Sequence, residues 1–425
     1  MNINFRKYII FWISQSVSQL GSAMTSFALI LWTYEQTNSA MAVSIMAFCN
    51  YLPYIAVSLF AGAFVDRHSK KKIMIVSDAA AAVCSLTVFL LSSYDLLQIW
   101  HIYVVNGIIG FMNAVQSPAL SVATEKMVPK GKMAQVSGMN SFSTNLITVL
   151  TPVIAAALFG LGDLKIILGV DLFSFTVAFF ILLFYIHIPE KEADRKHHET
   201  ALAGCKTGFR FLLENKGLLA IIVTIAVLNF FSRLTYENIL SPMILSRSGN
   251  NNATLAMVNA ALGIGGIVGG ILVSSGKLAR NHIKMIYVSA AISFLFGDVL
   301  MGLGRNTAAW CVAGLAASVP IPFIIAGQNV ILYKKIPSEM QGRVFAVRNA
   351  IQFSTIPIGI LLGGFLADYV FEPFMQSESN LANGLSYLVG NSSGSGMAVM
   401  FLCTGICGSA FSLFFYKRRI MRDLQ

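Results

Sequence analysis

Long apolar runs limit what this chain can fold into more than any other feature of its sequence. A hydrocarbon core of about 30 Å needs about 20 helical residues for each crossing. Only 12% of the 425 residues are charged, against about 25% in typical soluble domains. The sequence therefore predicts an all-α polytopic membrane protein. Its twelve expected transmembrane helices lie near residues 9–34, 43–65, 73–93, 98–124, 137–160, 165–188, 217–242, 253–275, 283–304, 308–333, 344–367 and 396–416.

The positions of the cations predict which ends of these helices face the cytoplasm. Cytoplasmic loops retain Lys and Arg. If both termini are cytoplasmic, nearly all of the 30 Lys and Arg residues fall in inner segments, and the outer side keeps only Lys165, Arg247 and Arg305. One further cation, Arg233, falls within a span. We therefore expect a multi-pass protein with both termini in the cytoplasm.

One long polar connection divides the expected spans six and six. It runs from about residue 189 to 216 and holds mixed charges. Adding 208 to positions in the first half lands on similar features in the second, for example Gly62 on Gly270. The sequence thus predicts a six-helix bundle over 1–188, a cytoplasmic linker over 189–216 and a second six-helix bundle over 217–425, arranged as parallel repeats. A long outer loop, 369–396, is interpreted as either a lid or a spacer.

The stretch "GAFVDRHSKKK", from residue 62, crowds an acid and several cations between two apolar spans. It resembles the loop 2–3 signature of the major facilitator superfamily, with Ser69 where that family usually has a second glycine. The resemblance implies a gating motif that latches the two halves together on the cytoplasmic side in one conformer, and a contact made in one conformer biases the equilibrium. The alternative is that the cations only fix topology. The matching residues are Gly62, Asp66, Arg67, Lys71 and Lys72.

Polar side chains recur at helical spacing inside four of the expected spans. An intramembrane polar stripe indicates a functional path by default, although helix-to-helix hydrogen bonding is the alternative. In the resembled family, the first, fourth, seventh and tenth helices line the central cavity, and these four carry the stripes. The predicted substrate cavity residues are Gln15, Gln19, Asn106, Asn113, Gln116, Asn229, Tyr236, Gln328 and Asn329.

Ionisable residues inside the spans are the candidates for coupling transport to protons. Arg233 and Glu237 form an i, i+4 pair, which either neutralises itself or exchanges a proton when a cation approaches. Asp78, Asp171 and Asp298 lie close to span ends and are interpreted as structural anchors first. The predicted proton-coupling residues are Arg233, Glu237, Asp171 and Asp298.

Several other classes of protein lack support in the sequence. "GIGGIVGG", residues 263–270, has no preceding strand and no following Lys-Ser/Thr, so it predicts helix packing through Gly265/Gly269 and Gly266/Gly270 rather than phosphate binding. The histidines show no metal-ligand spacing, and no nucleophile motif appears. We expect no cofactor, no metal, no enzymatic activity and no nucleic-acid partner, and we expect a monomer.

Longer segments, including "LPYIAVSLFAGAFVDRHSKKKIMI" and "ADYVFEPFMQ", look like the macrolide-efflux and enterobactin-exporter branch of the superfamily. That resemblance implies a proton-driven antiporter that exports drug-like molecules across a bacterial cytoplasmic membrane. The superfamily's proton-driven exporters commonly carry an arginine on the fourth helix, and Asn106 stands at the matching position here, which puts the coupling in question. A siderophore exporter, an importer or facilitator of a small metabolite, and a non-transporting sensor remain as alternatives.

Overall fold

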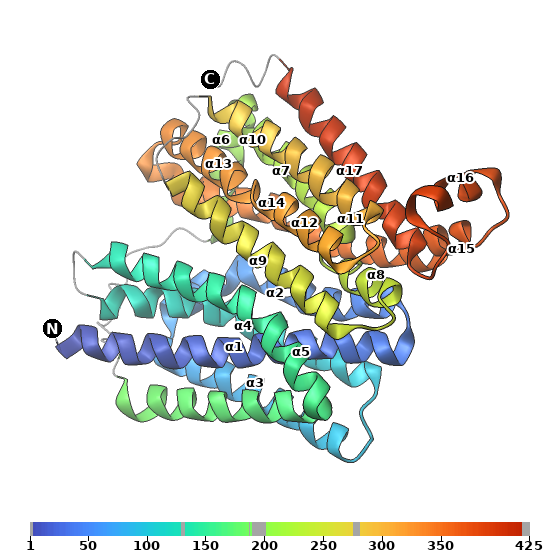
Figure 1. The fold of residues 1–425 in the computed structure, drawn as a ribbon. Coiled ribbons are helices and arrows are strands. Elements are labelled where there is room, and N and C mark those ends of the chain that lie inside the picture. The colour runs from blue at the N-terminus through green and yellow to red at the C-terminus, as the bar shows by residue number, and fades with distance from the viewer. Residues whose placement is uncertain (1–2, 129–131, 187, 189–200, 275–280, 419–425) are drawn as a thin grey trace. The chain divides into compact units, whose positions relative to one another are not determined.

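The computed structural model describes residues 3–128, 132–186, 188, 201–274 and 281–418, and every element within these ranges is a helix (Figure 1). The chain divides into two compact units. Unit 1 comprises residues 1–36 and 45–198, and unit 2 comprises residues 37–44 and 199–425. The start of the second helix therefore groups with the second unit, which the sequence did not indicate.

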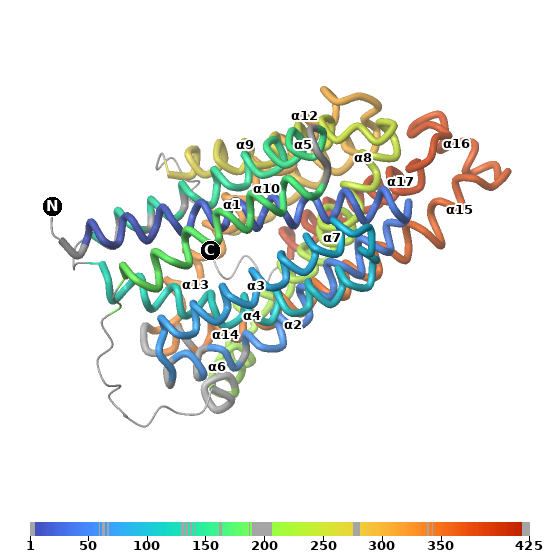
Figure 2. Tube along the Cα trace, turned by 90° about the horizontal axis from the view of Figure 1, so that it is seen from below, coloured from blue at the N-terminus to red at the C-terminus, as the bar shows by residue number. Residues whose placement is uncertain are grey.

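Unit 1 holds the first six expected spans. Its helices are α1 (Ile3–Thr37), α2 (Ala40–Arg67), α3 (Lys70–Ser93), α4 (Ile99–Met127), α5 (Met133–Phe180) and the π-helix η1 (Ile181–Tyr185). The 48 residues of α5 would extend about 72 Å if straight, which is too long for one crossing. The element instead contains two apolar segments of membrane length, 138–160 and 164–185. In this unit α3 packs against both α4 and α5 (Figure 2).

Unit 2 holds the remaining spans, several of which are broken into two helices. Proline causes one break, because α12 ends at Ser318 and α13 begins beyond Pro320. Two other spans contain π-helical turns. The elements are α6 (Ala201–Glu214), α7 (Lys216–Thr235), α8 (Leu240–Arg247), α9 (Asn252–Ser274), α10 (His282–Ile292), η2 (Ser293–Asp298), α11 (Val299–Leu303), α12 (Thr307–Ser318), α13 (Ile321–Lys335), α14 (Ser338–Leu366), η3 (Ala367–Phe371), α15 (Glu372–Met375), α16 (Asn380–Val389) and α17 (Ser395–Tyr416).

Within the described residues, 10 helical segments are long and apolar enough to cross a membrane. They coincide with ten of the twelve expected spans, and the prediction of an all-helical polytopic membrane protein is confirmed. Both α1 and α4 are long enough but are not among the 10. These two helices carry the polar stripes at Gln15 and Asn106, which lower their hydropathy.

Each unit has its own apolar core near the ends of the spans that are predicted to be cytoplasmic. In unit 1 it includes Tyr8, Phe11 and Met74, and in unit 2 it includes Ile222 and Tyr287. Burial of such side chains removes apolar surface from water or lipid and fills the space between helices at close packing. The cores thus hold the inner ends of the helices together and leave the polar stripes farther along the spans.

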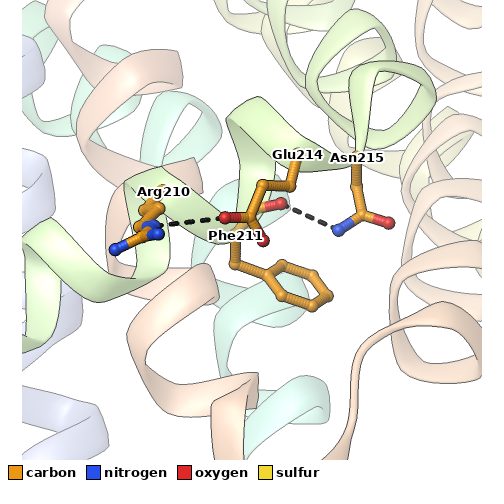
Figure 3. Close-up of polar contacts among 4 residues, drawn as sticks. All are labelled: Arg210, Phe211, Glu214 and Asn215. Carbon is orange, nitrogen blue, oxygen red and sulfur yellow. Dashed lines mark hydrogen bonds and ion pairs between the residues drawn. The ribbon is translucent and has the colours of Figure 1, made fainter.

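The expected linker contains a helix in its second half. Residues 189–200 lie outside the described residues, but α6 follows them and packs on α7 and α14. Leu212 of α6 is fully buried in the core of unit 2. At the end of α6, Asn215 donates its side-chain amide to the Phe211 carbonyl at 2.8 Å, and Arg210 pairs with Glu214 on the exposed face (Figure 3). The second half of the linker is therefore an amphipathic helix of unit 2.

Two glycine pairs on α9 were expected to allow close helix packing, and one of them does so. A Cβ on Gly265 would meet the Ser318 side chain, and one on Gly269 would meet the Val319 backbone. Gly266 and Gly270 have open space around them within the described residues. The prediction is confirmed for the first pair, whose close approach joins α9 to α12 and its end.

Candidate functional site

A polar cavity of about 460 Å³ lies inside unit 1. Its wall takes side chains from all five α-helices of that unit. The stripes on α1 and α4 supply most of the polar groups, while α2, α3 and α5 supply Asn50, Tyr54, Asp78, Ser85 and Asp171. The predicted cavity residues of the first half all lie in this wall: Gln15, Gln19, Asn106, Asn113 and Gln116.

Gly110, which lies on the polar stripe of α4, contributes to helix packing rather than to the polar wall. A Cβ at this position would overlap the backbone of Asn50, whose Cα would be 3.1 Å away. The side-chain amide of Asn50 also donates to the Asn106 carbonyl at 3.3 Å. Gly110 thus lets α4 approach the backbone of α2 closely, and this contact fixes the position of the polar stripe.

Replacing Gly110 with alanine should therefore destabilise unit 1, because the added methyl group meets backbone atoms that cannot rotate away. We expect a loss of about 1–3 kcal/mol, typical of overpacking, measured as a lower midpoint of thermal unfolding in detergent. Gly107→Ala is the matched control, since its Cβ would lie at an ordinary 3.7 Å from the Cys49 carbonyl oxygen. Equal midpoints for the two variants would contradict this packing account.

Asp171 is the most enclosed acid of the cavity. Its side chain is 3% exposed and accepts hydrogen bonds from Ser22 Oγ at 3.1 Å, Thr25 Oγ1 at 3.0 Å and Ser85 Oγ at 2.9 Å. These donors come from α1 and α3, so the carboxylate joins three helices. Among the described residues, no Lys, Arg or His pairs with it. Asp171 is therefore a buried acid that is held by neutral donors alone.

A second acid, Asp78, has unused hydrogen-bonding capacity in the same wall. Gln116 Nε2 donates to its Oδ1 at 2.5 Å. The Gln15 side chain faces the same carboxyl group without reaching hydrogen-bond geometry, so the buried Asp78 Oδ2 and Gln15 Nε2 make no hydrogen bond. A buried polar atom without a partner is costly. These atoms border the cavity, where a water molecule, a proton or a polar substrate group could satisfy them.

A smaller cavity of about 200 Å³ adjoins the first and continues along α1 toward its N-terminus. The two cavities share Gln15, Gln19 and Leu120, and the smaller one extends to Tyr8 and Asn140. The polar surface of unit 1 therefore runs from the middle of the spans toward their predicted cytoplasmic ends.

The predicted residues of unit 2 form separate networks. Tyr236 packs edge-on against Phe401, with ring centroids 5.3 Å apart, and its hydroxyl faces Asp298 without reaching hydrogen-bond geometry. Asp298 is 1% exposed and accepts from Thr404 Oγ1 at 2.8 Å. The expected Arg233–Glu237 ion pair is present on the half-buried side of α7.

The remaining three residues of the predicted unit 2 set differ in their surroundings. Gln328 is buried with no hydrogen-bond partner for its Nε2, and Asn329 accepts from Arg348 at 3.1 Å. Asn229 lies half-buried on α7. The roles of all these residues stay predictions.

The N-terminus of α2 is capped by an acid that was not among the residues predicted from the sequence. Asp368, in η3, accepts from Ser39 Oγ at 2.6 Å and from the backbone N–H groups of Ala40 and Met41 at 3.2 and 2.9 Å. These are the orphan donors of a helix N-terminus, which favour a negative charge. Asn238 also donates to Ser44. Unit 2 thus caps the first turn of α2.

The predicted gating motif is described only in part. The side chains of Gly62, Asp66 and Arg67 lie outside the described residues, although their backbone belongs to α2. Lys71 Nζ donates to the Leu183 and Ile186 carbonyls, both at 2.8 Å, and so caps the end of η1 within unit 1. Lys72 is exposed. Ser69, the departure from the family pattern, caps the N-terminus of α3 by accepting from the Lys72 N–H.

The comparison with known families agrees with this architecture. The sequence model described as Major Facilitator Superfamily matches residues 11–360. The chain belongs to the Major Facilitator Superfamily. It is 28% identical over 373 residues to macrolide efflux protein A of Streptococcus pyogenes, covering 86% of this chain and 90% of the relative. It is 22% identical over 308 residues to the enterobactin exporter EntS of Shigella dysenteriae, covering 71% of each.

Solved structures of the superfamily share the fold. A crystal structure of the nucleoside transporter NupG matches with a TM-score of 0.71 at 12% identity, over 97% of this chain and 100% of that one. At this identity the likeness shows the fold alone. The predicted resemblance to the macrolide-efflux and enterobactin-exporter branch is confirmed, and the protein is a multi-pass membrane transporter.

Two acids described above were not predicted as site residues from the sequence. Asp78 was interpreted as a structural anchor, and in the structure it lines the cavity on the same face of α3 as Ser85, seven residues later. Asp368 was not singled out, because nothing in the sequence places it beside residues 39–41. Only the three-dimensional packing of the superfamily fold brings these positions together.

Proposed function

We propose that the protein exports amphipathic small molecules of the macrolide type across the cytoplasmic membrane by alternating access, in exchange for protons. The observation that carries this proposal is the cavity of unit 1, whose wall holds two carboxylates and, among its described residues, no cationic side chain. The similarity to macrolide efflux protein A over 86% of the chain supports the substrate class.

The cavity supports a role for protons through Asp171 and Asp78. A carboxylate enclosed by neutral donors favours a positive partner, which is either a proton or a cationic group of the substrate. If the two compete for the same acids, loading of the substrate releases a proton, and protonation releases the substrate. Such competition is the thermodynamic requirement for antiport. Arg233, Glu237 and Asp298 are further coupling candidates in unit 2.

The proposal also assigns two gates. Asp66, Arg67 and their neighbours form the cytoplasmic gate that the family resemblance implies. On the predicted outer side, the Asp368 cap fastens the first turn of α2 to unit 2, whereas residues 45–67 of the same helix group with unit 1. Because the halves of such transporters rock against each other, we propose that this cap breaks when the outer side opens.

An accumulation assay tests the proposed function. Cells that express the protein should accumulate several-fold less of a radiolabelled macrolide than cells without it, and a protonophore should remove the difference. Apo-enterobactin and a lipophilic dye belong in the same panel, because similarity to EntS keeps siderophore export as an alternative. Equal accumulation of every compound in both strains would contradict the proposal, and higher accumulation in the expressing strain would indicate an importer.

A further inference from the structure

The segment between the last two spans contains a short, well-formed amphipathic helix. α16 begins after Ser379, whose side chain accepts from the Ala382 N–H at 3.1 Å, and ends at Gly390, whose φ of +87° is left-handed. One side of the helix is buried at Ala382 and Val389, which are 1% and 0% exposed. The long loop expected over 369–396 is therefore an ordered structure with a defined orientation.

The flank of α16 next to this buried side exposes large apolar side chains. Leu381, Leu385 and Leu388 recur at i, i+4 and i+7, so they share one face. Leu381 is 74% exposed and Leu388 is 52% exposed. Asn380, Asn383 and Tyr387 recur at i, i+3 and i+7 and share another face, where Tyr387 is 85% exposed. The leucine face in water would be unfavourable, because it leaves apolar surface hydrated.

Two arginines hold this helix in place. Arg305 Nη2 donates to the carbonyls of Tyr387 and Leu388 at 2.7 and 3.1 Å, and Arg247 Nη2 donates to that of Val389 at 2.6 Å. Arg247 also donates to the Gly302 carbonyl at 3.2 Å. These contacts satisfy the orphan carbonyls at the C-terminus of α16 and neutralise its partial negative charge. The leucine face is thus held outward from the rest of unit 2.

The surfaces next to α16 are those of membrane spans. α16 packs on α11, α15 and α17 (Figure 1). The exposed side chains on these spans are apolar, including Leu300 on α11 and Ile406 on α17. In a multi-pass membrane protein such faces meet lipid. The leucine face of α16 therefore continues a lipid-facing surface at the ends of the spans.

We propose that α16 is an interfacial helix that lies in the headgroup region of the outer leaflet. Its three leucines reach the acyl boundary, and Tyr387 lies at headgroup level, where aromatic residues are favoured. Because α16 itself carries no charged residue, neutral lipid is sufficient and anionic lipid adds nothing. The partner of this surface is the bilayer, and the proposal is independent of what the protein transports.

A site-specific fluorescent probe tests this placement in the full-length protein. The six cysteines are replaced, and an environment-sensitive nitrobenzoxadiazole label is attached to Leu388→Cys or Leu381→Cys in phosphatidylcholine nanodiscs. We expect blue-shifted emission and at least about twofold quenching by lipids brominated near the headgroup. Asn383→Cys, exposed on the polar face of the same helix, is the matched control and should show neither.

The outcomes separate the alternatives. Replacing part of the phosphatidylcholine with phosphatidylglycerol should leave the quenching unchanged. Water-like emission at both leucine positions would overturn the proposal. So would blue-shifted emission that brominated lipid does not quench, because that result indicates a protein partner or a second copy of the chain.

Discussion

Replacing Asp171 with asparagine should abolish the dependence of transport on the proton gradient. Asparagine keeps the shape of the side chain but imitates the protonated acid permanently. Coupling between two ligands typically changes affinity by about 5- to 150-fold, so substrate affinity should lose a pH dependence of that size. The measurement is labelled-macrolide binding to the purified protein between pH 5.5 and pH 8, together with gradient-driven transport.

A matched control separates charge from structure at this position. Ser85→Ala removes one of the three hydroxyl donors to Asp171 and keeps the carboxylate. Loss of one donor should lower stability by about 1 kcal/mol while the pH dependence remains. If the Asp171→Asn variant keeps the pH profile of the original protein, Asp171 is a structural anchor. If the Glu237→Gln variant loses the pH dependence of transport instead, the proton-coupling residue lies in unit 2.

Asp368→Asn should shift the conformational equilibrium toward the state that is open to the outside. Asparagine is a poorer partner for the helix N-terminus because it has no charge, and a negative charge beside a helix N-terminus contributes about 0.3–2 kcal/mol. A change of one or two kcal/mol alters a population ratio by a factor of about 5–30. The readout is the labelling rate of a cysteine at Gln19, in the cavity, by a membrane-impermeant maleimide added outside.

The same unit offers a control of the same chemistry. Glu372 accepts from the N–H groups of Gly394 and Met397 at 3.3 and 3.1 Å and so caps α17. The capped helix α17 lies wholly within unit 2, whereas α2 continues into unit 1. Glu372→Gln should therefore lower the stability of unit 2 without changing the labelling rate at Gln19. Equal labelling rates in the Asp368→Asn variant and the original protein would contradict the proposed outer gate.

The spans were predictable from the sequence because each must be a long apolar run in lipid. The broken helix at Pro320 was equally predictable, since proline cannot continue a helix. The five cavity residues of unit 1 also followed from periodicity, because Gln15 and Asn106 sit on stripes that no lipid-facing helix would keep. For these features a local rule was sufficient.

The remaining features depend on contacts between distant parts of the chain. No local pattern shows that Asp171 would collect hydroxyls from α1 and α3, or that Asp368 would cap a helix more than 300 residues earlier. The polar composition of the linker likewise did not indicate that residues 201–214 form α6, which buries Leu212 in the core of unit 2. Nothing local in the sequence distinguishes Gly265, which lies against Ser318, from Gly266, which has open space around it.

Transport into everted membrane vesicles tests the central claim most directly. Vesicles with an acidic interior that contain the protein should take up labelled macrolide, and a protonophore should stop the uptake. Vesicles that contain the Asp171→Asn variant should lose the gradient-driven part. Uptake that is the same in vesicles without the protein, or that occurs only in right-side-out vesicles, would contradict proton-driven export.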